Sequence, residues 1–502
     1  MSRLRSFCLA ALCALLLSAL PWRVTAQAAL IIGTLEPLLN LDPADAVTHF
    51  EQEVLSHLYT GLTRQRHGSL RYELALAEAH EASADGMTHT FRLRPDAAFD
   101  DGTPITAQTF ADSIERVLRL RGRAAELIAP YVRAAAVDES GALQIRLAQP
   151  LPPTFVRQLM ALPPFFPLHP QSFPSDRLNQ RPPLATLHTN GVYRLAAYSF
   201  DEYRLVANPS WRGAPPQTET VIVRRYESSA ALREALKRGE VQVAWRGLAS
   251  ADGREAQESA AVREHTAPSL QCFYLIVHQR REPFNAPQAR RVLMLSLSRA
   301  RAVSEGLEGY GAPLHAFTPF SAAEAPRYPD FELQALTDAL SAGGYSRFRQ
   351  IASEVQTARL LYGDSVLSAT ARLFSAVSNV DALRFSVQDI EPRAFLDQID
   401  RRAFRLIVIG WSPLVAHPHA YFEPLLTGAL ALGAEYDARE ATELLAQAAL
   451  SDSYAALEQL AFRDRVAIPL WQGVQRLYAA EAVGGVLIEP NFLLRYDQLR
   501  LD

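Results

Sequence analysis

Alternation of apolar and polar residues along several short stretches of the chain predicts β-strands. HTFRLR at 89–94 and LQIRL at 143–147 place apolar side chains at every second position, so one face of each strand would be apolar and the other polar. YRLVANPSW at 203–211 also indicates a strand, and TVIVRRY at 220–226 indicates a strand with little alternation.

Other stretches have the apolar spacing of an amphipathic helix. In SAALREALKRGE at 229–240, apolar residues occupy positions 231, 232, 235 and 236, and Gly239 follows as a terminator. The stretch at 284–307 predicts a longer helix with Asn285 as its N-cap. Residues 381–411 predict a strand, a helix and a buried strand. Strands that alternate with helices in this way indicate an α/β fold.

The stretch FDDGTPITAQTFADSIERVL at 99–118 contains two adjacent carboxylates, Asp100 and Asp101. Asp101 and Gly102 form a pair typical of turns, because the glycine tolerates a positive φ. Thr106 is placed to cap the helix that follows, whose apolar residues from 110 to 118 fall on one face. A turn and a helix cap therefore account for this stretch, and the paired acids need no catalytic role.

Composition narrows the possible classes of protein. With 502 residues, 49% of them hydrophobic, the chain is long enough for large buried cores and too long for one small domain. Its formal net charge is −4, and no basic stripe with interleaved aromatic residues is present. Nucleic-acid binding has no electrostatic support, so we expect no nucleic-acid partner.

Residues 1–28 have the three-part form of a secretory signal peptide. Two arginines precede an apolar run at 7–20, and small residues near 24–28 suit cleavage. The run is shorter than the roughly 20 residues that a transmembrane helix needs. We therefore expect a soluble protein that is exported to the periplasm.

The three cysteines add two expectations. Cys8 and Cys13 lie in the signal segment, and Leu12 stands where a lipoprotein cleavage site prefers a small residue, so we expect no lipid anchor. Cys272 lies in the apolar run CFYLIV, which is typical of a buried packing residue. A single remaining cysteine makes no internal disulfide.

Eight segments, taken in order, resemble motifs of a known family. LRPDAAFDDGTPITAQTFADSIERVL at 93–118 and FRLIVIGWSPLVAHPHAYFEPLL at 404–426 are two of them. Together they are similar to the extracellular solute-binding proteins of family 5, the oligopeptide-, dipeptide- and nickel-binding components of ABC importers. The other six lie at 40–64, 74–94, 189–198, 205–213, 234–245 and 282–303.

The resemblance implies a type II periplasmic-binding-protein fold, in which two lobes are joined by a hinge and the first lobe carries an extra subdomain. PSLQCFYLIVH at 268–278 and AIPLWQGVQ at 467–475 would cross between the lobes. The implied division is a signal peptide at 1–28, lobe I at 29–45, 187–268 and 475–502, the extra subdomain at 46–186, and lobe II at 269–474.

The resemblance also implies a function, which is to capture a peptide or peptide-like ligand by lobe closure and deliver it to inner-membrane ABC permease subunits. We expect a monomer without a cofactor. The candidate ligand contacts, by match to the family, are Thr48, His49, Asn190, Gly191, Tyr193, His278, Trp411, His417 and His419.

The loop after Trp411 departs from the family pattern. Peptide-binding members carry an aspartate three residues past this tryptophan, which pairs with the amino terminus of the ligand, whereas this chain has Leu414. An ammonium group buried without a carboxylate is costly. The loop carries His417 and His419 instead, similar to the loop of the nickel-binding members. Two histidines alone fall short of the three or four ligands of most metal sites, so we expect no resident metal.

Three alternatives remain open. The ligand could be a metal chelate of the nickel type or another small solute. The protein could be an exported hydrolase, but G-x-S-x-G, S-x-x-K and metal-hydrolase motifs are absent, so we expect no catalytic residues and no enzyme activity. It could also be a sensory or chaperone-like binding module that passes its ligand or signal to a membrane receptor.

The signal segment leads to a prediction about processing. We expect the exported protein to begin between Gln27 and Ala29 and to carry no lipid on Cys13, because cleavage follows the small residues after the apolar run. N-terminal sequencing and intact mass of periplasmic protein measure this. An N-terminus at Met1, or a modified Cys13, would contradict it.

Overall fold

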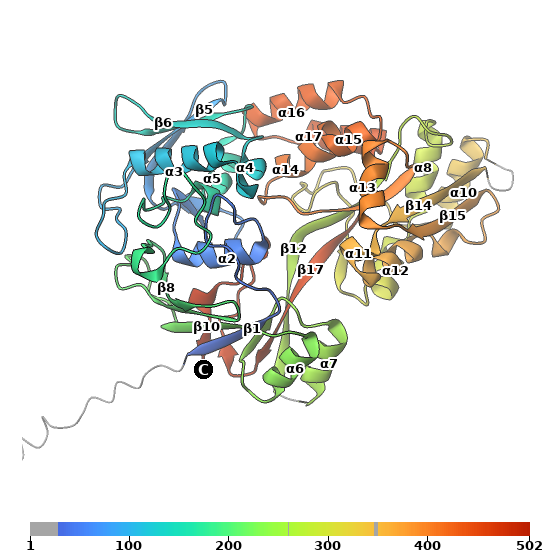
Figure 1. The fold of residues 1–502 in the computed structure, drawn as a ribbon. Coiled ribbons are helices and arrows are strands. Elements are labelled where there is room, and N and C mark those ends of the chain that lie inside the picture. Colours follow the sequence, from blue (N-terminus) through green and yellow to red (C-terminus); the bar gives the residue numbers. More distant parts are fainter. Residues whose placement is uncertain (1–28, 260, 346–349) are drawn as a thin grey trace, which may run out of the picture.

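In the computed structural model, residues 29–259, 261–345 and 350–502 are described, and the predicted signal segment at 1–28 lies outside them. The chain forms two lobes that are connected by a pair of long antiparallel strands, β12 (Val262–Val277) and β17 (Ala467–Ala480) (Figure 1). These strands contain the two segments that were predicted to cross between the lobes.

One large sheet runs through both lobes. Its strand order is β15-β14-β16-β12-β17-β11-β1-β10-β9-β8, with the short strand β13 (Gly311–Pro313) paired to β17. β12 and β17 pair from Val262 with Ala480 to Ile276 with Ala467, with irregularities between Pro268 and Cys272 and between Phe273 and Tyr274. The lobes therefore share a backbone hydrogen-bond ladder as well as a covalent connection.

Lobe I surrounds the end of the sheet where β17 returns. In its core, apolar side chains of the sheet pack against α2 (His49–Leu58). Its other elements are β1 (Leu30–Thr34), β8 (Tyr193–Tyr198), β9 (Glu202–Ala207), β10 (Thr220–Arg225), α6 (Ser229–Lys237), β11 (Val243–Trp245), α7 (Ser250–Ser259), β18 (Val483–Gly484) and β19 (Arg500–Leu501).

The extra subdomain lies on lobe I and has its own core. A four-stranded antiparallel sheet in the order β4-β5-β7-β6 packs against α3 (Ala107–Leu120), which lies in front of it in Figure 1. The remaining elements are β2 (Thr63–Gln65), β3 (Tyr72–Leu74), β4 (Ala77–Ala82), β5 (Thr88–Leu93), α4 (Arg123–Ile128), β6 (Val132–Val137), β7 (Leu143–Leu147) and α5 (Pro153–Leu159).

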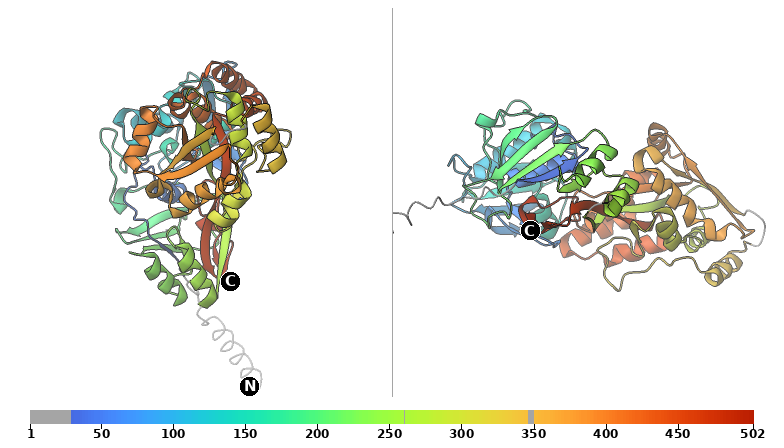
Figure 2. Two further views of the ribbon diagram at one scale, coloured as in Figure 1. Left: turned by 90° about the vertical axis from the view of Figure 1, so that its right-hand side faces the viewer. Right: turned by 90° about the horizontal axis from the view of Figure 1, so that it is seen from below.

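Lobe II carries most of the helices of the second half of the chain. The parallel strands β14 (Ile351–Thr357) and β15 (Leu383–Asp389) extend the sheet beyond β16 (Leu406–Trp411). The helices of this lobe are α8 (Pro287–Leu295), α9 (Arg299–Arg301), α10 (Leu333–Ala342), α11 (Arg359–Tyr362), α12 (Asp364–Leu373), α13 (Pro392–Asp400), α14 (His419–Phe422), α15 (Ala429–Gly433), α16 (Arg439–Ser451) and α17 (Ala455–Asp464). Seen from below, the blue and green first lobe lies beside the orange and brown second lobe, and α16 and α17, in red-orange, lie near the junction of the two lobes (Figure 2).

Most local predictions agree with these elements. All the segments that were predicted as strands contain strands, and α6 buries Leu232, Ala235 and Leu236 and is followed by Gly239 at a φ of 72°. Cys272 is buried, and burial raises the pKa of its thiol to about 12, so it remains a protonated packing residue.

The long helix predicted at 284–307 is wrong in two respects. Its N-cap is Ala286 and not Asn285, because Pro287 takes the first helical position, where its restricted φ fits and its missing N–H is not needed. The helix also ends at Leu295, and α9 begins at Arg299, where the Asp330 carboxylate accepts from the Arg299 N–H at 2.6 Å. A distant acid thus caps a second helix that the local pattern does not predict.

None of the helices in the described part of the chain is long and apolar enough to cross a membrane.

Thr106 caps α3 as predicted, and this leads to a stability test. Its hydroxyl accepts from the Thr109 N–H at 3.3 Å, and the Thr109 hydroxyl accepts from the Thr106 N–H at 3.1 Å. We expect Thr106→Ala to lower the free energy of unfolding by about 1 kcal/mol, because an N–H at the helix start loses its partner. Denaturant unfolding measures this. Thr106→Ser retains the hydroxyl and serves as the control, and an equal loss in both variants would contradict the capping role.

Candidate ligand-binding cavity

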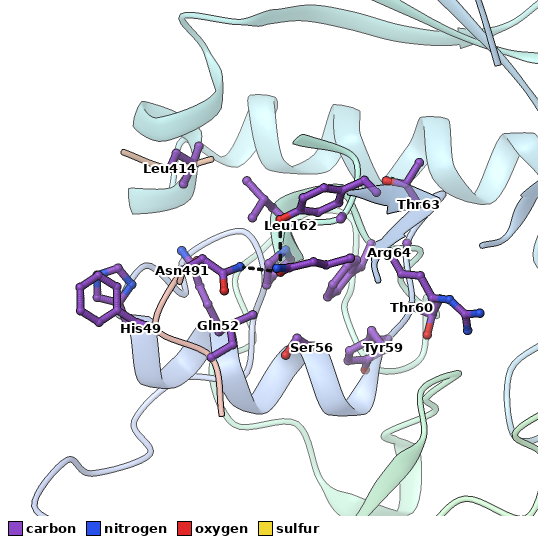
Figure 3. A pocket seen from close by; sticks show the side chains of 18 of the residues that line it. His49, Gln52, Ser56, Tyr59, Thr60, Thr63, Arg64, Leu162, Leu414 and Asn491 are labelled. Atoms are coloured by element: carbon purple, nitrogen blue, oxygen red, sulfur yellow. Dashed lines mark hydrogen bonds between the residues drawn. The ribbon is translucent and has the colours of Figure 1, made fainter. Parts of the chain in front are cut away.

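A cavity of about 880 Å³ lies between lobe I, the extra subdomain and one loop of lobe II. Its walls come from α2, the β2–β3 hairpin, α4 and the segments at 161–166 and 491–498, and lobe II contributes Trp411 to Leu414 and Ala420. Figure 3 shows α2 along one side and Leu414 on the opposite side. Most of the wall therefore belongs to the first lobe and its subdomain.

Helix α2 presents a polar face to this cavity. His49, Gln52, Ser56 and Tyr59 line it, and their spacing of three or four residues places them on one side of a helix. The opposite side carries Phe50, Val54, Leu55 and Leu58, all buried in the core of lobe I. Figure 3 shows Gln52 and Ser56 on the cavity side of the helix.

Thr48 determines where α2 begins. Its hydroxyl accepts from the Glu51 N–H at 3.1 Å, and the Glu51 carboxylate accepts from the Thr48 N–H at 3.1 Å. This is a capping box. It places His49 in the first turn, where its ring stacks on Phe492 with the ring centres 4.5 Å apart. Thr48 therefore orients the wall, while His49 is part of it.

The end of the cavity near the β2–β3 hairpin is polar and charged. The Gln65 amide oxygen accepts from Asn491 Nδ2 and from the Tyr72 hydroxyl, both at 3.3 Å (Figure 3). Arg64 pairs with Glu73 at 2.8 Å, and His67 lies 3.5 Å from Asp497. Arg66 and Arg495 also line this end of the cavity. Guanidinium groups favour carboxylates and other planar anions as partners.

Glu53, on the buried side of α2, connects this helix to the C-terminal segment that forms the adjoining part of the cavity wall. Its side chain is fully buried and accepts from Trp245 Nε1 at 3.0 Å, the Leu494 N–H at 2.7 Å and the Tyr496 hydroxyl at 2.5 Å. Arg246 Nη2 also lies 3.3 Å from it. These contacts join α2, the end of β11 and the C-terminal segment. The position of His49 against Phe492 depends on this network.

The loop that follows Trp411 packs against the extra subdomain. Trp411 is half-buried, lines the cavity and donates from Nε1 to the Ala420 carbonyl at 2.8 Å. Leu414 and Ala420 also line the cavity, and Val415 and Ala420 are buried in the subdomain core. The loop therefore joins lobe II to the subdomain by apolar contact, and it presents a leucine to the cavity.

His417 and His419 occupy this contact between lobe II and the subdomain and do not line the cavity. The Nε2 atom of His417 lies 3.0 Å from the Thr154 hydroxyl and 3.3 Å from the Asp452 carboxylate. The Nδ1 atom of His419 lies 3.2 Å from the Tyr454 hydroxyl. Burial lowers the pKa of His419 to about 3, so its ring is uncharged near neutral pH.

The hydrogen bond from His417 is the main cause that lowers the pKa of Asp452. A carboxyl group whose folded pKa is lowered stabilises the fold above its unfolded pKa, and that stability is lost as the pH falls. The His417–Asp452 contact therefore contributes to stability above the ordinary pKa of an aspartate, and this contribution is lost as the pH falls through the lowered pKa of Asp452.

Asn190, Gly191 and Tyr193 lie behind α2, where they support the wall. Asn190 exchanges two hydrogen bonds with the backbone of Thr60, at 3.2 and 3.0 Å. A Cβ atom on Gly191 would lie 2.4 Å from the His57 carbonyl oxygen, so only glycine permits this close approach. Tyr193 is fully buried and donates to the Thr218 carbonyl at 2.7 Å.

His278 lies in lobe II, away from the cavity. Its Nδ1 atom accepts from the Arg280 N–H at 3.2 Å, and its ring packs against Phe404 with centres 5.6 Å apart. Among the candidates from the sequence, His49 and Trp411 are the two whose side chains line the cavity.

Comparison with known proteins agrees with this architecture. Residues 71–432 match the model of the family described as "Bacterial extracellular solute-binding proteins, family 5 Middle". The chain belongs to this family.

Individual members of family 5 match over nearly the whole chain. The chain is 24% identical over 494 residues to the probable D,D-dipeptide-binding periplasmic protein DdpA of Escherichia coli (strain K12), and the match covers 92% of each. The unliganded open form of the periplasmic murein tripeptide-binding protein MppA superposes with a TM-score of 0.81 at 21% identity, over 95% of this chain and 97% of MppA. NikA from Brucella suis in complex with Fe(III)-EDTA gives a TM-score of 0.74 at 18% identity, over 94% and 100%.

Several cavity residues of this family 5 protein are missing from the candidates that sequence reasoning provides. Gln52 and Ser56 could have been found, because they follow His49 at helical spacing on the polar face of α2. Asn491 and Arg495 have no such signal. They reach the cavity because β17 returns the chain to lobe I, more than four hundred residues after α2.

The Glu53 network leads to a second stability prediction. We expect Glu53→Gln to lower the free energy of unfolding by about 2 kcal/mol. The glutamine amide has one acceptor oxygen, and its NH₂ group would face buried hydrogen-bond donors that now bond to the carboxylate. Denaturant unfolding measures the loss.

Glu73→Gln is the matched control, since Glu73 forms a half-exposed pair with Arg64 and such pairs contribute about 0–1 kcal/mol. A loss at Glu53 no larger than the loss at Glu73 would show that the network does not hold the wall.

Proposed function

We propose that this family 5 protein is the periplasmic solute-binding component of an ABC importer, which captures a peptide or peptide-like ligand and delivers it to the membrane permease. The observation that carries the proposal is the cavity between the first lobe and the loop of lobe II. Its volume of about 880 Å³ lies within the range of about 300–1,000 Å³ that is usual for small-molecule sites. Similarity to DdpA and MppA, whose names specify a dipeptide and a murein tripeptide, supports this ligand class.

The proposed mechanism is capture by movement of the lobes about β12 and β17. Lobe II contributes Trp411, Leu414 and Ala420 to the wall, so rotation of this lobe would open or close that side of the cavity. Closure removes the ligand from water and strengthens its polar contacts. We propose a monomeric protein that is exported by a cleaved signal peptide and performs no catalysis.

The proposed contacts follow from the wall. His49 and Trp411 provide ring surfaces, which bury apolar area with little loss of side-chain entropy. Gln52 and Ser56 add hydrogen-bonding groups from α2. The guanidinium groups of Arg64 and Arg495 suit the carboxylate end of a peptide. Thr48, Asn190, Gly191 and Tyr193 act by positioning α2 rather than by touching the ligand.

The amino end of a peptide needs a different partner from the one that the family resemblance implies. Leu414 lines the cavity and offers no charge. Three carboxylates line it elsewhere: Glu73 is paired with Arg64, Asp497 is paired with His67, and Glu126 on α4 is exposed and has no ion pair among the described residues. We propose that Glu126 receives the ammonium group.

A metal chelate is the second candidate ligand. The similarity to NikA with bound Fe(III)-EDTA favours it, and the arginines at the hairpin end of the cavity could hold the carboxylates of a chelator. His417 and His419 would take no part in this case, because they face Thr154, Asp452 and Tyr454.

Calorimetry with a panel of di- and tripeptides and their N-acetylated forms tests the proposal. We expect free-amino peptides to bind, and Glu126→Gln to weaken that binding about tenfold, which corresponds to about 1.4 kcal/mol. N-acetylated peptides should bind to both proteins with equal affinity, because they carry no ammonium group.

Glu139→Gln is the control, since Glu139 is exposed on the same subdomain outside the cavity. Binding of Ni²⁺ or Fe³⁺ chelates without binding of any peptide would replace the peptide proposal with the chelate alternative. Recovery of cleaved peptide would contradict a pure binding role.

A further inference from the structure

A second cluster of chemically active side chains lies outside the cavity, on the subdomain side of lobe I. Asp101, His169 and His188 come from three separate segments of the chain, and one potential ligand atom of each lies within 4.8 Å of the others. None of the three lines the cavity. They form the one group of three or more histidine, cysteine or acidic side chains with this spacing in residues 29–259, 261–345 and 350–502.

The separations between these atoms match those of ligands around one small ion. Asp101 Oδ2 lies 3.4 Å from His169 Nε2 and 3.9 Å from His188 Nδ1. The neighbouring carboxylate of Asp100 lies 3.3 Å from His188 Nδ1. Ligands held tetrahedrally at about 2.0–2.1 Å from Zn²⁺ lie about 3.4 Å from each other. The cluster is therefore close to the required geometry before any ion binds.

Hydrogen bonds and ring packing also orient the side chains of this cluster. The Thr103 hydroxyl donates to Asp101 Oδ2 at 2.8 Å, and the Thr103 N–H donates to Asp101 Oδ1 at 2.9 Å. The His169 ring packs edge-on against Phe99 with the ring centres 5.2 Å apart. Hydrogen bonds and packing of this kind orient metal ligands in known sites.

We propose that Asp101, His169 and His188, with Asp100 as a fourth donor, bind one Zn²⁺ or a similar divalent transition-metal ion. Two imidazoles and carboxylate oxygens are a donor set that such ions accept. His169 would bind through Nε2. Its ring proton then moves to Nδ1, so the 3.2 Å hydrogen bond that Nδ1 accepts from the Gln171 N–H is given up.

The site has a structural consequence for lobe I. His188 and Thr189 lead into Asn190, which bonds the backbone at the end of α2, and the Tyr59 hydroxyl donates to the His188 carbonyl at 3.1 Å. The ion would join this segment to the turn at 100–102. The ion would therefore stabilise the segment that supports the end of α2, and this effect does not depend on which ligand the cavity binds.

The test uses full-length exported protein without a histidine tag, after removal of metals with a chelator. Calorimetry with Zn²⁺ should show one ion bound per chain, Zn²⁺ should raise the midpoint of thermal unfolding, and Co²⁺ should give the visible absorption of a tetrahedral site. His169→Gln and His188→Gln should each weaken Zn²⁺ binding at least tenfold and abolish the Co²⁺ absorption. Asp101→Asn, which retains an acceptor for the Thr103 N–H, should also weaken it.

His80→Gln is the matched control, because His80 belongs to another pair of histidines, 2.9 Å from His89, that is not part of such a group. It should bind Zn²⁺ as the unmodified protein does. Circular dichroism of the metal-free variants confirms that each is folded. Absence of Zn²⁺ binding to the unmodified protein, or binding that neither His169→Gln nor His188→Gln weakens, would overturn the proposal and leave the cluster as a set of hydrogen-bonded side chains.

Discussion

The pairing of β12 with β17 is the constraint on which the rest of the structure depends. The two strands run antiparallel over most of their length, from Val262 with Ala480 to Ile276 with Ala467, and each carries the chain from one lobe to the other. Because backbone hydrogen bonds along this ladder fix the register, the residues that follow β17 must return to lobe I. Segment 491–498 therefore lies against α2, and the cavity has its second wall.

Within lobe I, a buried carboxylate makes this return specific. Glu53 is surrounded by donors from β11, from the backbone of Leu494 and from Tyr496. A buried charge without such donors would be costly, and with them it favours one arrangement of the two segments over others. Apolar packing alone between α2 and the C-terminal segment would be less selective, because hydrophobic contact has no preferred direction.

The contact between lobe II and the subdomain has a different character. Val415 and Ala420 are buried in the subdomain core, and His417 bridges Thr154 and Asp452 at its edge. The leucine at 414 is consistent with this surrounding, since it continues an apolar surface into the cavity. Leu414, which replaces the aspartate of the family motif, thus also contributes to the contact between lobe II and the subdomain.

The sequence by itself determined the local elements and the family. Alternation and helical spacing depend on neighbours within one or two turns, so the strands, α6, the turn at Asp101 and Gly102 and the cap at Thr106 could all be predicted. The order of the motifs indicated the two-lobed fold, and His49 and Trp411 were placed among the candidate contacts. The break between α8 and α9 was missed, because Asp330 supplies its cap from a distant segment.

Only the tertiary structure decided which side chains share a site. His417 contacts Asp452 and His419 contacts Tyr454, and neither histidine lines the cavity. Asn491 and Arg495 line the cavity together with residues of α2. The tertiary structure also placed His169 and His188 beside Asp101, whose sequence pattern indicates no more than a turn. Such groupings depend on how the lobes and the subdomain pack, and a pattern of neighbouring residues carries no information about contacts between segments that are distant in the chain.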